Sequence, residues 1–170
     1  LPAGVAVQGA GRARAGMGVD AADYSGSGRP GVIVGNFSEE NMALYRNDGD
    51  GLFVDDAPGS TIGRESHFSL TFGLFFAEVD LDGRPDIFAA NGHISDVFPP
   101  GMNGAITHAQ RPHLFRNLGQ GRFDETILAA GESLARRIVG RGAAYVDIDP
   151  HGDLHLIGTE NQGPAPVYPN

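Results

Sequence analysis

The 170-residue sequence contains no cysteine, no tryptophan and no lysine, because all twelve of its basic residues are arginine. Without cysteine the chain cannot form disulfide bonds, thiolate-bound structural zinc, a catalytic thiolate or a thioether-linked haem. No apolar run approaches the roughly 20 residues that a membrane-spanning helix needs. We therefore expect no membrane insertion.

Negative charge dominates the composition. There are 21 Asp and Glu against 12 basic residues, which gives a formal net charge of −9. This balance argues against nucleic acid or an anionic membrane surface as the main partner. An acidic chain attracts cations instead, and calcium is the first cation to consider.

Glycine and proline are abundant, with 26 and 11 residues, and the Val, Ile, Phe and Tyr residues fall in short runs. Short apolar runs separated by turn-forming residues are typical of strands joined by tight turns. The length suits one domain with a single core. We expect an all-β fold in one domain, residues 1–170.

An internal repeat organises the chain. Three stretches align on their loops: ADYSGSGRPGVIVGN, AEVDLDGRPDIFAAN and YVDIDPHGDLHLIGTEN. Each consists of a short apolar strand, a polar loop centred on glycine and a second apolar strand. Missing such a repeat would misassign the whole fold.

The repeat continues beyond these loops. LYRNDGDGLF from Leu44 matches LFRNLGQGRF from Leu114, and VYPN from Val167 looks like a truncated third copy. Each unit therefore holds about four strands. The unit boundaries fall approximately at residues 15–70, 71–135 and 136–170, the last unit being truncated.

These features predict a β-propeller built from four-stranded antiparallel blades, of which about two and a half are present. The loop starts lie 55 and 69 residues apart, near or above the usual blade length. Closed propellers need about four to eight blades. We therefore expect the chain to be part of a larger propeller, completed by further sequence or by other chains.

The second unit carries an insertion of about 15 residues, around residues 95–112. Insertions in repeat proteins usually lie on one face, which is often the binding face. Long surface loops are also simply tolerated in many proteins. A recognition surface and a variable loop both remain open for this segment.

The loop EVDLDGRPD in the second unit has the pattern of a calcium site. Its carboxylates occupy loop positions 1, 3, 5 and 9, and a glycine at position 6 permits a sharp bend. Calcium requires six to eight oxygen ligands. The predicted ligands are the side chains of Glu78, Asp80, Asp82 and Asp86 and the carbonyl of Arg84. A turn without an ion is the less favoured alternative, because a turn needs only one or two Asp or Gly residues. An EF-hand is excluded, because position 12 is Ala89 and the flanking segments are predicted strands.

The other two loops have weaker patterns. In the third loop the candidate ligands are Asp147, Asp149, His151, Asp153 and His155. Because imidazole is a poor calcium ligand and suits softer metals, calcium, a transition metal and no metal all remain open there. The first loop offers only Asp23, Ser25 and Ser27, so we expect it to have kept the turn and lost the ion.

Several stretches together carry a family resemblance: AGMGVDAADYSGSG, VGNFSEENMALYRNDGDGLF, FAEVDLDGRPDIFAANGHI, QRPHLFRNLGQGRFDE and GRGAAYVDIDPHGDLHLIGTENQGP. The chain resembles the FG-GAP/VCBS-type β-propellers, and among them the ASPIC/UnbV-associated group related to cartilage acidic protein. The resemblance implies a secreted, periplasmic or cell-surface protein with calcium in its blade loops, used for adhesion or assembly.

The resemblance also implies a ligand set. The family's D-x-D-x-D-G-x-x-D positions fall on Glu78, Asp80, Asp82 and Asp86 in the second loop, and on Asp147, Asp149 and Asp153 in the third. The chain departs from this pattern at Ser25, Ser27, Gly31, His151 and His155.

The predicted function is a calcium-stabilised module outside the cytoplasm that binds a protein or other chains without catalysis. The alternative is a carbohydrate-binding or carbohydrate-active propeller, with a glycan as partner, although four Tyr and no Trp leave little surface for sugar stacking. A hydrolase site at His93, Ser95 and Asp96 is less favoured than a satisfied loop histidine, since no nucleophile-elbow or zinc-protease motif accompanies them. Catalysis elsewhere stays open but is not expected.

Overall fold

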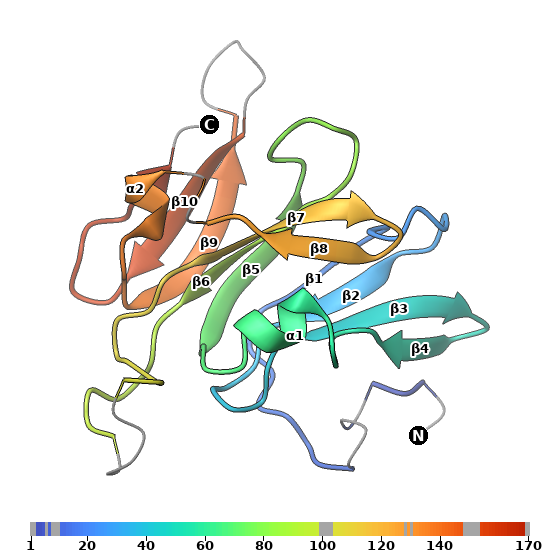
Figure 1. Ribbon diagram of the computed structural model, residues 1–170, viewed down its shortest axis with the longest axis horizontal. Coiled ribbons are helices and arrows are strands. Elements are labelled where there is room, and N and C mark those ends of the chain that lie inside the picture. Colours follow the sequence, from blue (N-terminus) through green and yellow to red (C-terminus); the bar gives the residue numbers. More distant parts are fainter. Residues whose placement is uncertain are drawn as a thin grey trace.

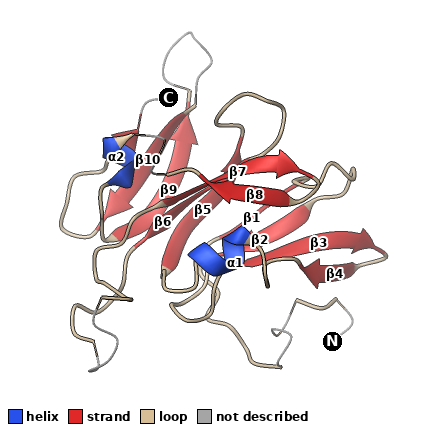
Figure 2. Cartoon of the chain, in the orientation of Figure 1, coloured by secondary structure: helices blue, strands red, loops and turns tan. Residues whose placement is uncertain are grey.

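The computed structural model describes residues 3–5, 7, 11–98, 104–127, 129, 131–147 and 154–168. Three antiparallel sheets follow one another along the chain (Figures 1 and 2). The first contains β1 (Val19–Ala22), β2 (Gly31–Val34), β3 (Ala43–Gly49) and β4 (Leu52–Asp55). The second contains β5 (Thr71–Ala77), β6 (Asp86–Asn91), β7 (His113–Gly119) and β8 (Arg122–Glu125). The third contains β9 (Gly140–Val146), β10 (His155–Glu160) and β11 (Val167–Tyr168).

Each sheet is a meander in which neighbours in sequence are neighbours in space. The strand order is β1-β2-β3-β4 in the first sheet, β5-β6-β7-β8 in the second and β9-β10-β11 in the third. The expected all-β fold with four-stranded antiparallel blades is therefore confirmed, with the last blade shorter than the other two. The first strands β1, β5 and β9 lie side by side, and the sheets fan outward from them (Figure 1).

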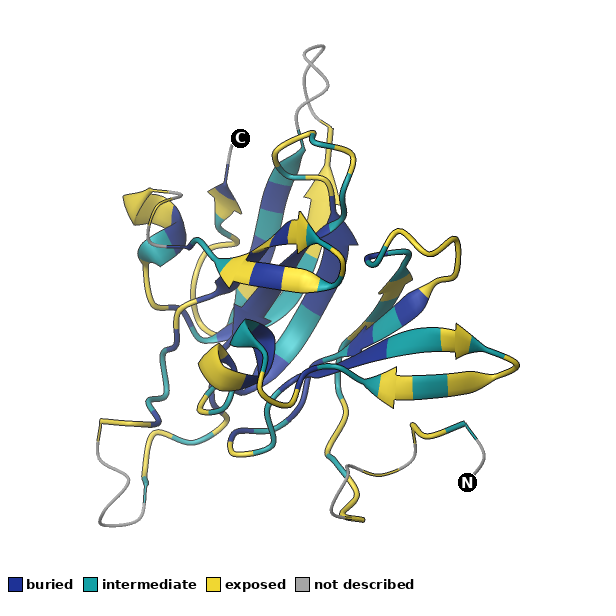
Figure 3. Cartoon of the chain, turned by 45° about the vertical axis from the view of Figure 1, so that its right-hand side comes forward, coloured by how far each residue is buried: buried dark blue, intermediate teal, exposed yellow. Residues whose placement is uncertain are grey.

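Two apolar layers hold the sheets together, one on each face of the middle sheet. Alternate residues of a strand point to opposite faces, so Phe76 faces the first sheet and Phe75 the third. The first layer includes Ile33, Met42, Leu44, Phe76, Ile87 and Phe115. The second includes Phe75, Phe88, Leu114, Leu156 and Tyr168. The middle sheet is consequently the most deeply buried (Figure 3).

The first strands approach so closely that side chains are excluded between them. A Cβ on Gly18 would lie 2.3 Å from the carbonyl oxygen of Phe72, and one on Gly73 would lie 2.4 Å from the amide nitrogen of Ala143. Gly18 and Gly73 occupy the same position in their repeats, five residues before the loop starts. The repeated glycine therefore sets the spacing between successive sheets.

Two short helices lie in the connections between sheets. Helix α1 (Thr61–Glu65) begins after Ser60, whose Oγ accepts a hydrogen bond from the Gly63 amide at 3.2 Å. Helix α2 is Glu132–Ala135. Part of the insertion is tied down as well, because Gln110 forms an isolated β-bridge with Ile138. No helix within the described ranges is long and apolar enough to cross a membrane.

Candidate metal centre

The loop between β5 and β6 gathers two of the predicted carboxylates around one arginine. Nε of Arg116, on β7, pairs with the Asp80 carboxylate, and its guanidinium also lies 3.7 Å from Asp82. Asp82 is paired with Arg84 and accepts a hydrogen bond from the Arg84 amide at 3.0 Å. Leu81 (φ 55°) and Gly83 (φ 83°) provide the sharp bends that turn Asp80 and Asp82 to the same side.

Asp86 has a different role from Asp80 and Asp82. It is buried, and its two carboxylate oxygens accept hydrogen bonds from the backbone amides of Asn117 at 2.8 Å and Val79 at 3.1 Å. Burial raises the pKa of the Asp86 carboxyl, the charges of Asp80 and Asp82 raise it further, and the two amides offset only part of this. Asp86 thus fastens the loop to β7, and its charge is energetically costly without a nearby cation.

The donor chemistry of this loop suits a hard cation. Asp80 and Asp82 offer carboxylate oxygens, which calcium and magnesium prefer. Both carboxylates already lie beside one cation, the Arg116 guanidinium. Glu78, the fourth predicted acid, is exposed at the start of the loop. Among the residues that the structure describes, no three His, Asp or Glu side chains form a preassembled metal cluster. Calcium would therefore have to displace Arg116 from the two aspartates.

The first loop satisfies its single carboxylate without an ion. Asp23 accepts hydrogen bonds from the amides of Gly28 at 2.6 Å and Ser27 at 3.0 Å, and its Oδ1 lies 3.4 Å from the Ser25 hydroxyl. Burial alone would raise the pKa of Asp23, but these hydrogen bonds and one from Gly26 outweigh it and hold that pKa below its ordinary value. In this loop, backbone amides stabilise the charged carboxylate without a bound cation.

The repeated Gly-Arg-Pro step closes both loops by the same contacts. Nε of Arg29 donates to the carbonyl of Asn47 at 3.0 Å, and Nε of Arg84 donates to the carbonyl of Asn117 at 2.9 Å. Each asparagine returns a hydrogen bond from its side-chain amide to the proline carbonyl of its loop, at 3.1 and 3.0 Å. The turn is therefore retained because it fastens the first hairpin of a blade to its third strand, whether or not acids are present.

The first loop has no acid at the position of Asp86, because the ring of Tyr24 occupies the space that a side chain there would need. Gly31 stands where the second loop has Asp86, and a Cβ on Gly31 would lie 2.4 Å from the Tyr24 ring. Tyr24 stands where the second loop has the smaller Val79, and its ring stacks on Phe76 with centroids 6.0 Å apart. The first loop thus contributes an aromatic ring to the apolar layer where the second keeps a carboxylate.

The third loop is only partly described. Asp147 is exposed at the end of β9, and His155 begins β10 opposite Val146. The other predicted ligands, Asp149, His151 and Asp153, lie outside the described residues. Whether this loop binds calcium, another metal or none stays a prediction.

His93, which the sequence placed beside Ser95 and Asp96, is held by its own loop. Its Nδ1 accepts a hydrogen bond from the Ser95 amide at 3.1 Å, and its ring packs edge-on against Phe37 with centroids 5.4 Å apart. The Ser95 hydroxyl donates to the carbonyl of Val97 at 2.9 Å, away from the imidazole. This is the geometry of a satisfied loop histidine.

No role for Asn47 or Asn117 was predicted from the sequence. A signal was present, because both asparagines recur in the matched LYRN and LFRN segments and each unit also repeats Gly-Arg-Pro. Two features that recur together in successive units indicate a contact within the unit.

One family model matches part of the chain. Residues 23–89 match the FG-GAP-like repeat. The match covers less than half of the chain and runs from the first loop through most of β6, so it includes both Gly-Arg-Pro loops. An FG-GAP-like repeat is a β-propeller-type module often involved in binding. A search among curated proteins found no match for the chain.

Proposed function

We propose that this chain is a segment of a calcium-binding β-propeller that serves as a binding or assembly module outside the cytoplasm. The observation that carries the proposal is the convergence of Asp80 and Asp82 on Arg116 in the β5–β6 loop. Arg84 would add its carbonyl, and the buried charge of Asp86 would gain from a nearby cation. Membership of the ASPIC/UnbV-associated group belongs to the same proposal, on the resemblance of the five stretches quoted above.

The proposed location outside the cytoplasm rests on the calcium affinity that we expect of this loop. Its ligands come from a short exposed turn that has two arginines within reach, so we expect modest affinity. Extracellular modules bind calcium with dissociation constants of about 10⁻⁴ to 10⁻³ M, far weaker than cytosolic sensors. A secreted, periplasmic or cell-surface protein would meet enough calcium to fill such a site.

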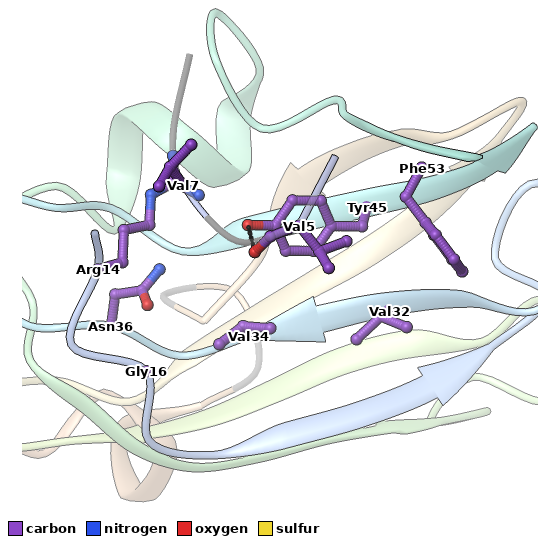
Figure 4. Close-up of a pocket in the computed structure, with 9 residues that line it drawn as sticks. All are labelled: Val5, Val7, Arg14, Gly16, Val32, Val34, Asn36, Tyr45 and Phe53. Carbon is purple, nitrogen blue, oxygen red and sulfur yellow. Dashed lines mark hydrogen bonds between the residues drawn. The ribbon is translucent and has the colours of Figure 1, made fainter. Parts of the chain in front are cut away.

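The outer face of the first sheet supports a role in assembly. A cavity of about 370 Å³ there is lined by Val32, Val34, Tyr45 and Phe53 (Figure 4). Their repeat equivalents in the middle sheet include Ile87 and Phe115, which pack against the first sheet.

The residues that the structure describes cover the apolar face only in part. Val5 and Val7 lie across the cavity and remain 43% and 46% exposed, and the Tyr45 hydroxyl lies 3.4 Å from the Val5 carbonyl (Figure 4). Because the same face of the next sheet is covered by a sheet, we propose that a sheet of a second copy of the chain covers this one as well.

Thermal unfolding with and without calcium tests the metal proposal. A ligand that binds only the folded state at about 100 times its dissociation constant adds about 2.7 kcal/mol per site, which raises the melting temperature by several degrees. We expect this rise in the wild type with excess calcium over chelator. The rise should shrink in Asp82→Ala and persist in Ser27→Ala, the same loop position in the first unit. Equal melting temperatures of the wild type in calcium and chelator would refute the calcium site.

Sedimentation velocity tests the assembly proposal separately. We expect the wild type to associate as its concentration rises and Val34→Asp, which places a charge in the apolar face, to remain monomeric. The melting temperature of Val34→Asp should stay near that of the wild type, because Val34 faces away from the layer between the first two sheets. A wild type that sediments as a monomer at every concentration would refute self-association through this face.

A further inference from the structure

A chain of three polar side chains joins different parts of the second unit. The Ser69 hydroxyl lies 2.9 Å from Nε2 of His113, and Nδ1 of His113 lies 3.4 Å from the carboxylate of Glu125. Ser69 precedes β5, His113 begins β7 and Glu125 ends β8. The His113 side chain is only 11% exposed and that of Glu125 18%. This order of serine, imidazole and carboxylate is the arrangement that activates a serine nucleophile.

The serine and the histidine open into a polar cavity of about 180 Å³. The insertion supplies one wall through Gln110 and Thr107. Gln110 is fixed there, because its side-chain oxygen accepts a hydrogen bond from the Leu70 amide at 2.9 Å and its side-chain nitrogen donates to the Phe68 carbonyl at 3.2 Å. A substrate would therefore meet a nucleophile in a preformed recess.

Two arginines and one acid, Glu65, line the cavity, which gives the lining a net positive charge. Arg111 and Arg137 both line it, and NH1 of Arg137 donates to the Thr107 hydroxyl at 2.7 Å. A guanidinium carries five N–H donors, so Arg137 has further donors besides the one that Thr107 accepts. Such donors can stabilise the oxyanion of a tetrahedral intermediate or hold an anionic part of a substrate.

The first unit has a simpler contact at the positions equivalent to Ser69, His113 and Glu125. Its equivalents of Ser69, His113 and Glu125 are Arg14, Ala43 and Asp55. There NH1 of Arg14 pairs directly with Asp55 at 2.9 Å, so one ion pair fastens the segment before β1 to β4. The second unit replaces this direct pair with a longer chain that contains an imidazole and lines a cavity.

We propose that Ser69, His113 and Glu125 form a hydrolytic site for small carboxylic esters that carry negative charge. Ser69 Oγ would attack the ester carbonyl carbon while His113 Nε2 accepts the hydroxyl proton. The carbon–oxygen bond to the alcohol then breaks, and His113 returns the proton to the departing alkoxide. Water hydrolyses the acyl-Ser69 ester by the same steps, so ester and water yield acid and alcohol. Glu125 orients the imidazole through Nδ1.

A fluorophosphonate probe tests the nucleophile directly, because it bonds to an activated serine oxygen with loss of fluoride. We expect mass spectrometry of the labelled wild type to locate the adduct on Ser69. Ser69→Ala should not label, and Ser133→Ala, which removes an exposed serine of α2, should label as the wild type does. An adduct on another residue, or no adduct in a folded wild type, would overturn the proposal.

Ester hydrolysis tests the roles of the other two residues. His113→Asn should lower kcat/KM for 4-nitrophenyl acetate by about 100-fold or more, because it removes the general base. Glu125→Gln should lower kcat with little change in KM, since it affects orientation and not substrate contact. Melting temperatures of both variants distinguish a lost reaction from a lost fold. Unchanged hydrolysis in a folded His113→Asn protein would refute the mechanism.

Substrate charge tests the arginines of the cavity. The wild type should prefer mono-4-nitrophenyl succinate, whose acyl part is anionic, over 4-nitrophenyl acetate. Arg137→Gln should reduce this preference chiefly through KM for the succinate. Equal kcat/KM values for the two esters in the wild type would refute the anionic substrate class.

Discussion

Nε of Arg84 donates to the main-chain carbonyl of Asn117 at 2.9 Å, which fastens the β5–β6 loop to the third strand of its own blade. Asn117 is fully buried and donates in return to the Pro85 carbonyl at 3.0 Å. It also donates to the Tyr24 carbonyl of the first blade at 2.9 Å. The residue that closes a loop therefore joins two blades as well.

Asn117→Ala should lower the free energy of unfolding by about 2–4 kcal/mol, because it leaves buried carbonyls without donors. Asn47, its equivalent in the first blade, is less buried. Among the described residues its side-chain amide donates only to its own loop, through the Pro30 carbonyl. Asn47→Ala should cost about 1 kcal/mol. Urea denaturation of both variants measures the difference. Equal losses would mean that the contact between Asn117 and Tyr24 contributes nothing.

Gly73→Ala should destabilise the protein by about 3 kcal/mol or prevent folding, because its Cβ would collide with the backbone of β9, which cannot move without separating the sheets. Gly59→Ala is the control. Gly59 has an unfavourable φ of 80° for alanine but open space around it, so its cost should be about 1 kcal/mol. Thermal unfolding distinguishes the two. A Gly73→Ala protein as stable as Gly59→Ala would contradict the close approach of β5 and β9.

Most of the fold was predictable because the strand and turn pattern of one blade is repeated along the sequence. The paired segments from Leu44 and Leu114 indicated a third and fourth strand in each of the first two units. VYPN from Val167 indicated a third strand in the last, and the structure places β11 there. The strands that pair in each blade are consecutive in the sequence, so the repeated pattern of strands also predicts which strands pair.

The arrangement of the candidate site was less predictable, because partners distant in sequence determine it. The spacing of acids suggested that Asp86 would join Asp80 and Asp82, yet the Asn117 amide, 31 residues away, engages one of its oxygens. Arg116 reaches Asp80 only because β7 pairs with β6 in one particular register. The spacing of acids within the loop does not predict the register between β6 and β7.

The same limit applies to Ser69 and Glu125. They are separated by the insertion and by three strands, and neither belongs to a recognisable catalytic motif. Only the folding of the second blade brings both to His113.

Arg116→Gln should strengthen calcium binding about tenfold, because it removes a cation that competes for Asp80 and Asp82. The estimate follows from Coulomb energies of about 1 kcal/mol for charges a few ångströms apart in water. Arg46, the equivalent residue of the first blade, pairs with Asp48 and Asp56 instead, so Arg46→Gln should leave the affinity unchanged. Calorimetric titration measures both. An affinity that Arg116→Gln does not raise would mean that calcium binds elsewhere than at Asp80 and Asp82.

Tyr24 should make the fold sensitive to alkaline pH. Its ring is buried in the layer between the first two sheets, and its hydroxyl donates to Asp56 at 3.3 Å. Burial raises the pKa of Tyr24 well above its ordinary value, and the charge of Asp56 raises it further. As the pH rises past about 10, the unfolded chain therefore loses the phenolic proton before the folded chain does.

Stability should consequently fall from about pH 10 upward, by up to about 1 kcal/mol per pH unit from this residue. Tyr24→Phe should cost about 1 kcal/mol at pH 8, where the hydrogen bond to Asp56 is lost. Its stability should then decline less steeply than that of the wild type, so the two curves converge above pH 10. Burial also raises the pKa of Tyr168, but both proteins share that residue and its effect cancels. Urea midpoints at pH 8 and pH 10.5 measure the convergence, and parallel curves would show that Tyr24 ionises as readily in the folded chain as in the unfolded one.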